Sequence, residues 1–169
     1  KHRVSCGAHP SYPDRINFGR VSQATTPEAL GSSIKEQVQQ LLHIANQHNI
    51  LIDYIKPHGA LYNDSCKPHI LNTLISVASF FKLPLMLSAS LDLDAPLNNS
   101  AITRHENTPH QRNPLKHRSI AAQCHDAGIG FIAEAFADRG YDQYGRLLKR
   151  GTPGALLNTQ QSIEQVNNL

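Results

Sequence analysis

The alternation of short apolar runs with longer amphipathic segments constrains the fold of this chain most strongly. Apolar runs of strand type are predicted at 3–6, 50–55, 83–89 and 129–133, with a short fifth run at 154–157. Apolar residues at three- and four-residue spacing predict helices over 27–47, from residue 68 onward, over 119–127 and over 162–166. Strands separated by helices are typical of a parallel sheet with crossover helices, so the predicted class is α/β.

The length of 169 residues suits one folding unit, and we predict a single α/β domain over 1–169. The stretch 91–118 interrupts the alternation, because it is rich in Asn, Pro, His and Arg and has no apolar period. An irregular insertion of this length in a compact domain is typical of a lid, a partner surface or a disordered segment.

Composition argues against several functional classes. A formal net charge of +3 with scattered basic residues favours solvated surface patches over nucleic-acid binding. No apolar stretch approaches the ~20 residues that cross a membrane, so no membrane partner is expected, and no secretory leader pattern follows the basic start of the chain. Three cysteines without CxxC spacing favour a reducing compartment over a disulfide framework, which predicts a cytoplasmic protein.

Ionisable side chains follow three of the predicted strands. The segments 6–14, 56–59 and 134–139 come directly after the first, second and fourth strands. Because parallel strands leave a sheet at the same edge, we expect these segments to converge there. Imidazoles, carboxylates and fixed cations at one site can perform acid–base chemistry and hold an anion or a polarised carbonyl. The residues concerned are His9, Asp14, Lys56, His58, Glu134, Asp138 and Arg139.

Structural roles for the same residues remain open at this point. His9 and His58 could satisfy backbone groups of the loops, although two histidines in equivalent positions after strands favour a shared site. Lys56 could extend its amine from a strand end into solvent. Asp138 and Arg139 could form an ion pair that fixes their own loop.

A metal site is the weaker interpretation of these histidines. His9 and His58 with a carboxylate could ligate zinc or manganese, but no HxH or HExxH signature supports this, so no metal ligands and no bound transition metal are predicted. The sequence also has no GxxxxGK[ST] and no GxGxxG, the two common nucleotide-binding loops.

Three long motifs resemble a known family. GAHPSYPDRINFGR at 7–20, IKPHGALYN at 55–63 and EAFADRGYDQYGRLLKRGTPGALL at 134–157 are similar to the LamB/YcsF family of lactam-utilisation proteins. This family provides the A-type component of bacterial ATP-dependent 5-oxoprolinase. The resemblance implies a distorted TIM-like α/β barrel, of the kind shared with carbohydrate deacetylases. It also implies opening of 5-oxo-L-proline, a lactam, to L-glutamate with ATP and Mg, in company with B and C subunits.

Two motifs of that family are missing from this chain. An Asp-Leu-Asn-Cys-Asp strand motif with its following loop, and a late Val-His-Gly-Asp motif, do not occur. The expected barrel is therefore incomplete, and its open sheet edges favour a homo-oligomer or a covering partner chain. A non-catalytic interaction subunit or a truncated remnant, and a metal-dependent amidase or deacetylase, remain the alternative functions.

The resemblance and the strand-end positions together suggest individual roles. Lys56 and Arg139 are expected to hold anionic groups, and His9 or His58 to act as general base for water. Asp14 or Asp138 would orient the imidazole. Tyrosines at the site would donate to the carbonyl unless they pack beneath the loops, and arginines would clamp a carboxylate or phosphate. The predicted substrate-binding residues are Gly7, Tyr12, Arg20, Gly59, Tyr62, Asn63, Glu134 and Arg150.

Overall fold

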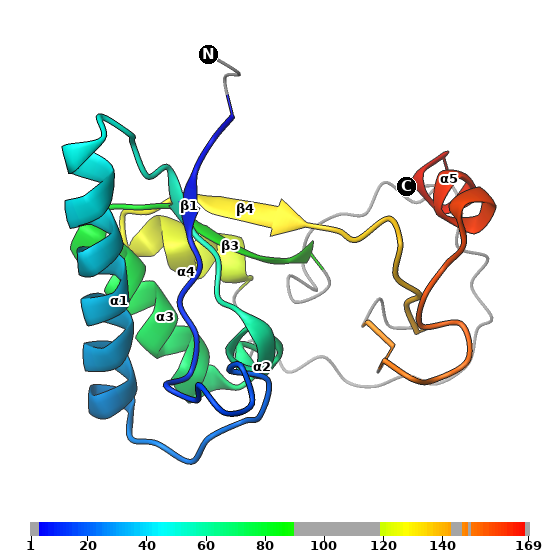
Figure 1. The fold of residues 1–169 in the computed structure, drawn as a ribbon, viewed down its shortest axis with the longest axis horizontal. Helices are drawn as coiled ribbons and strands as arrows, with labels where there is room; N and C mark the ends of the chain where they lie inside the picture. Colours follow the sequence, from blue (N-terminus) through cyan, green and yellow to red (C-terminus); the bar gives the residue numbers. More distant parts are fainter. Residues whose placement is uncertain (1–3, 90–118, 143–146, 149, 168–169) are drawn as a thin grey trace. The chain divides into compact units, whose positions relative to one another are not determined.

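The computed structural model describes residues 4–89, 119–142, 147–148 and 150–167 (Figure 1). The chain divides into two compact units, Lys1–Leu87 with Ile120–Ala133, and Ser88–Ser119 with Glu134–Leu169. The elements in chain order are β1 (Gly7–Ala8), α1 (Pro27–Gln47), β2 (Tyr54–Ile55), α2 (Gly59–Asp64), α3 (Pro68–Phe81), β3 (Leu85–Ser88), α4 (Ile120–Asp126), β4 (Phe131–Glu134) and α5 (Thr159–Asn167).

The sheet has the strand order β1-β2-β3-β4, the order in which the strands occur in the sequence. β1 pairs in parallel with β2, with Gly7 opposite Tyr54, and β2 pairs in parallel with β3, with Ile55 opposite Leu85. The Leu85 amide donates to the carbonyl of Gly130, just before β4, at 3.0 Å. The predicted α/β class, with a parallel sheet and crossover helices, is confirmed.

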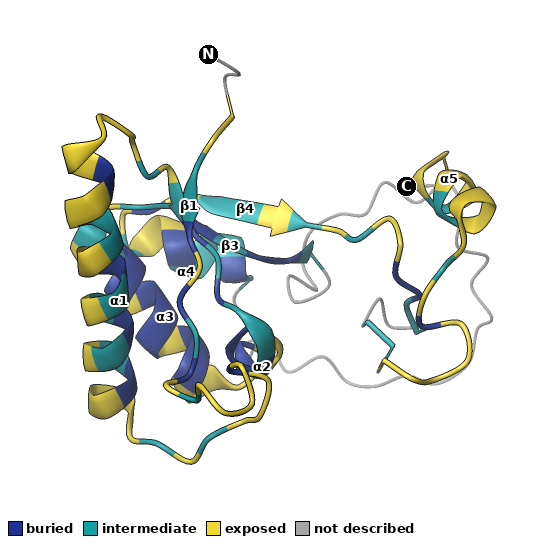
Figure 2. Ribbon diagram, viewed as in Figure 1, coloured by how far each residue is buried: buried dark blue, intermediate teal, exposed yellow. Residues whose placement is uncertain are grey.

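α1 forms where its sequence signals predict it. Thr26 is the N-cap, its side chain accepts from the Ala29 amide at 3.2 Å, and Pro27 occupies the first turn, where its missing N–H is tolerated. The residues that α1 buries recur at four- and seven-residue spacing and face α3 (Figure 2). They are Leu30, Ile34, Val38 and Ala45.

α3 is equally regular, and its predicted inward residues are all buried. These are Ile70, Leu71, Leu74, Ile75 and Ala78. The helix ends at Lys82, which adopts the left-handed conformation with φ 55° and donates its amide to the Ala78 and Ser79 carbonyls. α1 and α3 pack against each other, and their shared apolar stripe supplies much of the core of the first unit.

The predicted strands are longer than the observed ones. The first strand lies at 7–8 rather than 3–6, and the second is confined to 54–55, the two residues that pair with β1. Leu51, near the start of the predicted second run, is 80% exposed. The run at 83–89 forms a strand only over 85–88, and the run at 129–133 shifts to 131–134. The short run at 154–157 contributes one antiparallel bridge, Arg139 with Leu156, and no strand of the sheet.

The remaining helices differ from the prediction at their ends or in their existence. The helix predicted over 119–127 spans 120–126, ahead of Gly128 at φ 73°, and the one predicted over 162–166 spans 159–167. α2 is not predicted by the sequence, because the Pro57-His58-Gly59 stretch has the composition of a loop. The predicted insertion at 91–118 lies outside the described residues. Within the described residues, no helix is both long and apolar enough to span a membrane.

Candidate functional site

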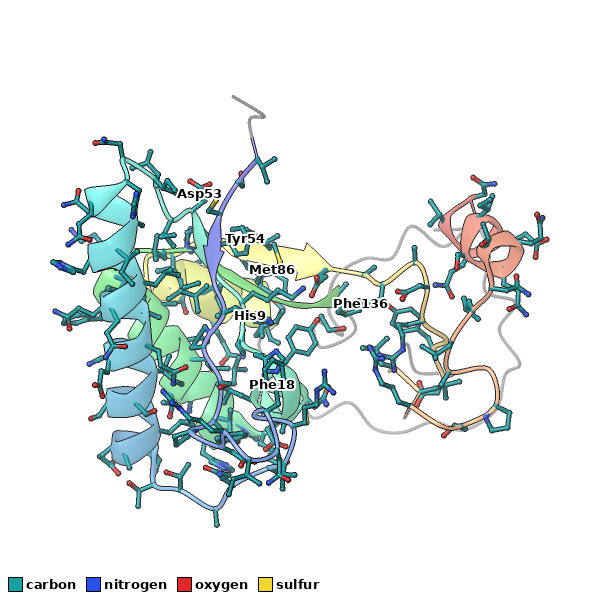
Figure 3. All side chains as sticks on the ribbon, in the orientation of Figure 1. His9, Phe18, Asp53, Tyr54, Met86 and Phe136 are labelled. Atoms are coloured by element: carbon teal, nitrogen blue, oxygen red, sulfur yellow. The ribbon has the colours of Figure 1, made fainter. Side chains whose placement is uncertain are left out.

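His9 and His58 meet at the edge of the sheet where β1 and β2 end. His9 follows β1, and His58 follows β2 as the N-cap residue of α2. His58 Nδ1 lies 3.0 Å from His9 Nε2, and the two rings pack edge to face with centroids 4.9 Å apart. The predicted convergence of these two histidines is confirmed. Figure 3 labels His9 beyond β1 and Phe18 further along the same loop.

A backbone seam continues the pairing beyond the two strands. Lys56 N–H donates to Ala8 O at 2.8 Å, and His58 N–H donates to Pro10 O at 2.8 Å. A third bond runs from the Ala60 amide to the Gly19 carbonyl at 2.9 Å. These three bonds, called the seam below, place the two imidazoles opposite each other, because they fix the register of the segments that carry them.

The outer ring nitrogen of each histidine is held by a backbone carbonyl. His9 Nδ1 lies 2.6 Å from Lys56 O, and His58 Nε2 lies 3.0 Å from Phe18 O. The Phe18 ring also packs edge-on against the His58 ring, with centroids 5.2 Å apart. The two imidazoles therefore form the centre of a hydrogen-bonded chain that begins and ends on carbonyl oxygens.

Asp14 shapes the loop that presents Phe18 O. Its Oδ1 accepts from the Asn17 amide and from Asn17 Nδ2, both at 3.1 Å, and its carbonyl accepts from Gly19 N at 2.8 Å. The turn places Phe18 at φ 55°, the left-handed region. Asp14 thus contacts the loop that carries Phe18 O, and through that backbone it could orient His58; the predicted role of Asp14 or Asp138 in orienting the imidazole stays a prediction.

A cavity of about 250 Å³ opens beside the pair. It is lined by Gly7, Ala8, His9, Tyr54 and Lys56, so the predicted neighbours His9 and Lys56 share one space. A Cβ on Gly7 would overlap the Tyr54 ring, which explains why glycine stands there: the ring lies directly over the backbone. This volume of about 250 Å³ lies just below the ~300–1,000 Å³ typical of ligand pockets, which favours a small molecule.

Tyr12 has a structural role rather than the predicted contact with substrate. It is 1% exposed, and its hydroxyl donates to Asp64 Oδ2 at 2.8 Å, while Lys67 Nζ lies 2.8 Å from Asp64 Oδ1. Burial, and then the hydrogen bond and charge of Asp64, raise the pKa of Tyr12 well above its ordinary range. Burial would raise the pKa of Asp64, but hydrogen bonds from Lys67, Tyr12 and Ser22 and the Lys67 charge lower it overall.

The second unit holds the other predicted ionisable residues. Arg139 is 9% exposed and donates from Nε to Ala155 O at 2.9 Å and from Nη2 to Leu148 O at 2.6 Å. This guanidinium fixes its own loop through carbonyls, a geometry that does not support its predicted role in holding substrate anions. Asp138 and Arg150 are exposed, and Glu134 is half-buried. The convergence of these residues with the histidines stays a prediction.

The other predicted substrate-binding residues lie in the first unit. Arg20 is exposed and its guanidinium carbon lies 5.3 Å from the centroid of the Phe18 ring, beside the histidines. Gly59 has φ 57°, and Tyr62 and Asn63 lie on α2, the first buried and the second exposed. Their contacts with a substrate stay predictions.

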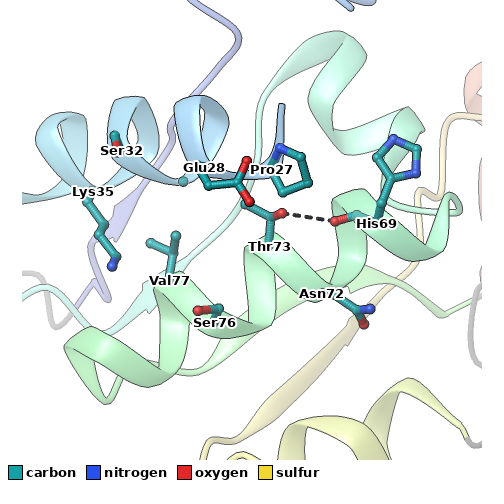
Figure 4. A pocket seen from close by; sticks show the side chains of 10 residues that line it. Pro27, Glu28, Ser32, Lys35, His69, Asn72, Thr73, Ser76 and Val77 are labelled. Atoms are coloured by element: carbon teal, nitrogen blue, oxygen red, sulfur yellow. Dashed lines mark hydrogen bonds between the residues drawn. The ribbon is translucent and has the colours of Figure 1, made fainter. Parts of the chain in front are cut away.

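A larger cavity of about 570 Å³ lies between α1 and α3 (Figure 4). Side chains of both helices line it, among them Glu28, Lys35, His69 and Asn72. None of the predicted site residues belongs to it. We favour the smaller cavity as the functional site, because parallel α/β folds place their sites at the carboxyl ends of strands.

Three residues of the site are not anticipated by the sequence. Phe18 supplies the carbonyl for His58, Tyr54 lines the cavity, and Gln37 clamps the loop after β1: its Oε1 accepts from Ser11 N at 3.0 Å and its Nε2 donates to Ser11 O at 2.9 Å. Of the three, only Gln37 could have been noticed in the sequence, as a polar residue beside the apolar stripe of α1. Among the described residues, no cluster of three or more His, Cys, Asp or Glu could hold a metal ion.

The LamB/YcsF family model matches residues 1–95 and 100–169. The A-type 5-oxoprolinase subunit of Vibrio cholerae serotype O1 is 35% identical over 164 residues, which cover 96% of this chain and 57% of that protein. The corresponding protein of Vibrio parahaemolyticus is 36% identical over 170 residues, covering 99% and 58%. The chain thus spans a little over half the length of these curated relatives.

A solved structure supports the same fold. The lactam utilization protein from Thermus thermophilus superposes with a TM-score of 0.71 at 24% identity, covering 96% of this chain and 57% of that one. The likeness agrees with the TIM-like α/β fold expected from the motifs. With the family model matching almost every residue, the chain belongs to the LamB/YcsF family.

Proposed function

We propose that this chain acts as an A-type component of 5-oxoprolinase, in the opening of 5-oxo-L-proline to L-glutamate. The observation that carries the proposal is the identity of about 35% to relatives named as the A-type 5-oxoprolinase subunit. The strand-end cavity adds chemical support, because its small volume and its His9 and Lys56 lining suit a compact ring that bears a carboxylate.

The reaction sets clear demands on such a site. Amide resonance makes a lactam carbonyl a poor electrophile, so the site must hold the ring, stabilise charge on oxygen and move protons. In the proposal Lys56 binds the anionic group of the substrate. The His9–His58 pair transfers protons between water and the substrate, a role for which imidazole is the usual side chain.

ATP is assigned to the assembled enzyme rather than to this cavity. The sequence has neither common glycine-rich phosphate loop, and about 250 Å³ is small for a nucleotide. The residues of the described site therefore do not fit ATP, and no step is derived through it. B and C subunits, and Mg with the nucleotide, belong to the same proposal.

Turnover by the assembled enzyme tests the proposal. Labelled 5-oxo-L-proline would be converted to glutamate by the chain mixed with B and C subunits, and the same assay would be run on variants H58A and K56M. We expect each variant to lose at least about a hundredfold in kcat/KM, the scale of a general acid–base group. H43A, which changes a histidine on α1 away from this cavity, is the matched control. Normal glutamate production by H58A would eliminate the assignment.

A further inference from the structure

The hydrogen-bonded chain through the two histidines requires more protons than two neutral imidazoles carry. The Lys56 and Phe18 carbonyl oxygens only accept, so His9 Nδ1 and His58 Nε2 must both donate. The central contact, at 3.0 Å, needs one further N–H on either His9 Nε2 or His58 Nδ1. Three N–H groups are needed, and two neutral rings supply two.

We propose that the His9–His58 pair holds three ring protons and one positive charge, and that with Lys56 it makes the adjoining cavity an oxyanion-binding site. In a neutral pair, two lone pairs would face each other at one of the three contacts. The 2.6 Å contact between His9 Nδ1 and Lys56 O agrees with a charged donor, because charge-assisted hydrogen bonds are the shorter ones.

The surroundings couple the third proton to the ligand. Among the described residues, the ionisable side chains on segments packed against the pair are Lys56 and Tyr54 from β2 and the chain after it, and Asp14, Arg15 and Arg20 from the loop around Phe18. The Lys56 ammonium opposes a second positive charge on the same cavity. An oxyanion lying between the two cations removes that opposition, so the anion and the third proton strengthen each other's binding.

The ligand is thus a small molecule with a carboxylate or a phosphoryl group. Both carry negatively charged oxygen atoms that can accept from the Lys56 ammonium and are attracted by the charge of the histidine pair, whose three N–H groups stay in their own contacts. The experiment separates the two. The inference rests on the proposed function only for the identity of the anion, since the proton count comes from the geometry alone.

Nitrogen NMR of the chain labelled in histidine tests the proton count. Protonated and unprotonated ring nitrogens resonate far apart, and the variants H9Q and H58Q assign the signals, with H43Q as a control for a histidine outside the pair. At neutral pH, with inorganic phosphate present, we expect the four nitrogens of the pair to account for three protons. Two protons on four nitrogens would overturn the proposal, as would zinc that binds stoichiometrically and displaces the central proton.

Calorimetry tests the binding site in two separate titrations, with inorganic phosphate and with 5-oxo-L-proline. We expect at least one to bind with uptake of protons. K56M should weaken that binding by about tenfold or more, the scale of one charge-assisted hydrogen bond, and H58Q should also weaken it because the charge of the pair is lost. K35M, which changes a lysine of α1 outside this cavity, is the control. Binding of neither anion, or unchanged binding by K56M, would overturn the site. Intact binding with normal turnover by H58A would instead refute the proposed catalytic role.

Discussion

Replacing Gly59 by alanine tests the contact between the α2 start and the loop after β1. Gly59 has φ 57°, where an L-residue is destabilised by about 1–2 kcal/mol. A Cβ there would also lie 2.5 Å from Gly19 O and 3.1 Å from Gly19 C, which are backbone atoms and cannot turn away as a flexible side chain would. The loop must shift, and the Ala60–Gly19 hydrogen bond, worth about 1 kcal/mol, weakens with it.

We therefore expect G59A to lower the free energy of unfolding by about 2–3 kcal/mol. The matched control is G128A, because Gly128 has a similar φ of 73° but no atom within 4 Å of a built Cβ. Both substitutions restrict the unfolded chain equally, so that contribution cancels in the comparison. Urea unfolding followed by circular dichroism gives both values. If G59A is no more destabilised than G128A, the close approach to Gly19 is refuted.

Further predictions concern the buried polar contacts. The pKa of Tyr12 is higher in the folded state than the ordinary tyrosine value of about 10. The free energy of unfolding should therefore be constant up to about pH 10 and decrease at higher pH, and Y12F should abolish that decrease. The lowered pKa of Asp64 should give stability that is lost as the pH drops below about 4, and D64N should remove this dependence, both measured by urea unfolding across pH. R139K should make the amide hydrogens of 138–141 and 154–157 exchange about tenfold faster or more, because lysine lacks the planar guanidinium that donates to both the Ala155 and Leu148 carbonyls. Q37L should cost about 1–2 kcal/mol through loss of two bonds to the Ser11 backbone, measured by urea unfolding.

Matched variants separate these contacts from general effects of substitution. R150K changes an exposed arginine of the second unit, and Q40L removes a glutamine whose bond to Glu36 lies on the exposed face of α1. Neither should change stability or exchange by more than about 0.5 kcal/mol. Equal effects of R139K and R150K would contradict the role given to the buried guanidinium.

Long periodic elements could be predicted from the sequence with accuracy. α1 and α3 bury the residues that their spacing selects, and the Thr26-Pro27 start of α1 is a local signal that no tertiary contact overrides. The bounds of the strands were harder to predict, because an apolar run does not indicate which of its residues will pair with a neighbouring strand. Leu51 belongs to the same run as Ile55, yet only Ile55 pairs.

The site was predictable in its centre and not in its supports. The placement of His9 and His58 after parallel strands follows from topology alone. The contact of His58 with Phe18 O depends on a left-handed turn, and the burial of Tyr12 depends on Asp64, fifty-two residues away in the sequence. Contacts of this kind produce no periodic pattern in the sequence. The sequence also does not distinguish a tyrosine whose hydroxyl donates to a buried carboxylate from one whose hydroxyl donates to a ligand.

The seam has a consequence for the order in which the molecule folds. It joins residues far apart along the chain, because 48 residues separate Ala8 from Lys56 and Pro10 from His58. Closing so long a loop loses chain entropy before any contact compensates for it, whereas α1, which lies inside the loop, needs only local contacts. Helix formation should shorten the path between the two segments, so the histidines come together late. During refolding, the ring signals of the two imidazoles should therefore reach their native values later than the helical signal of α1.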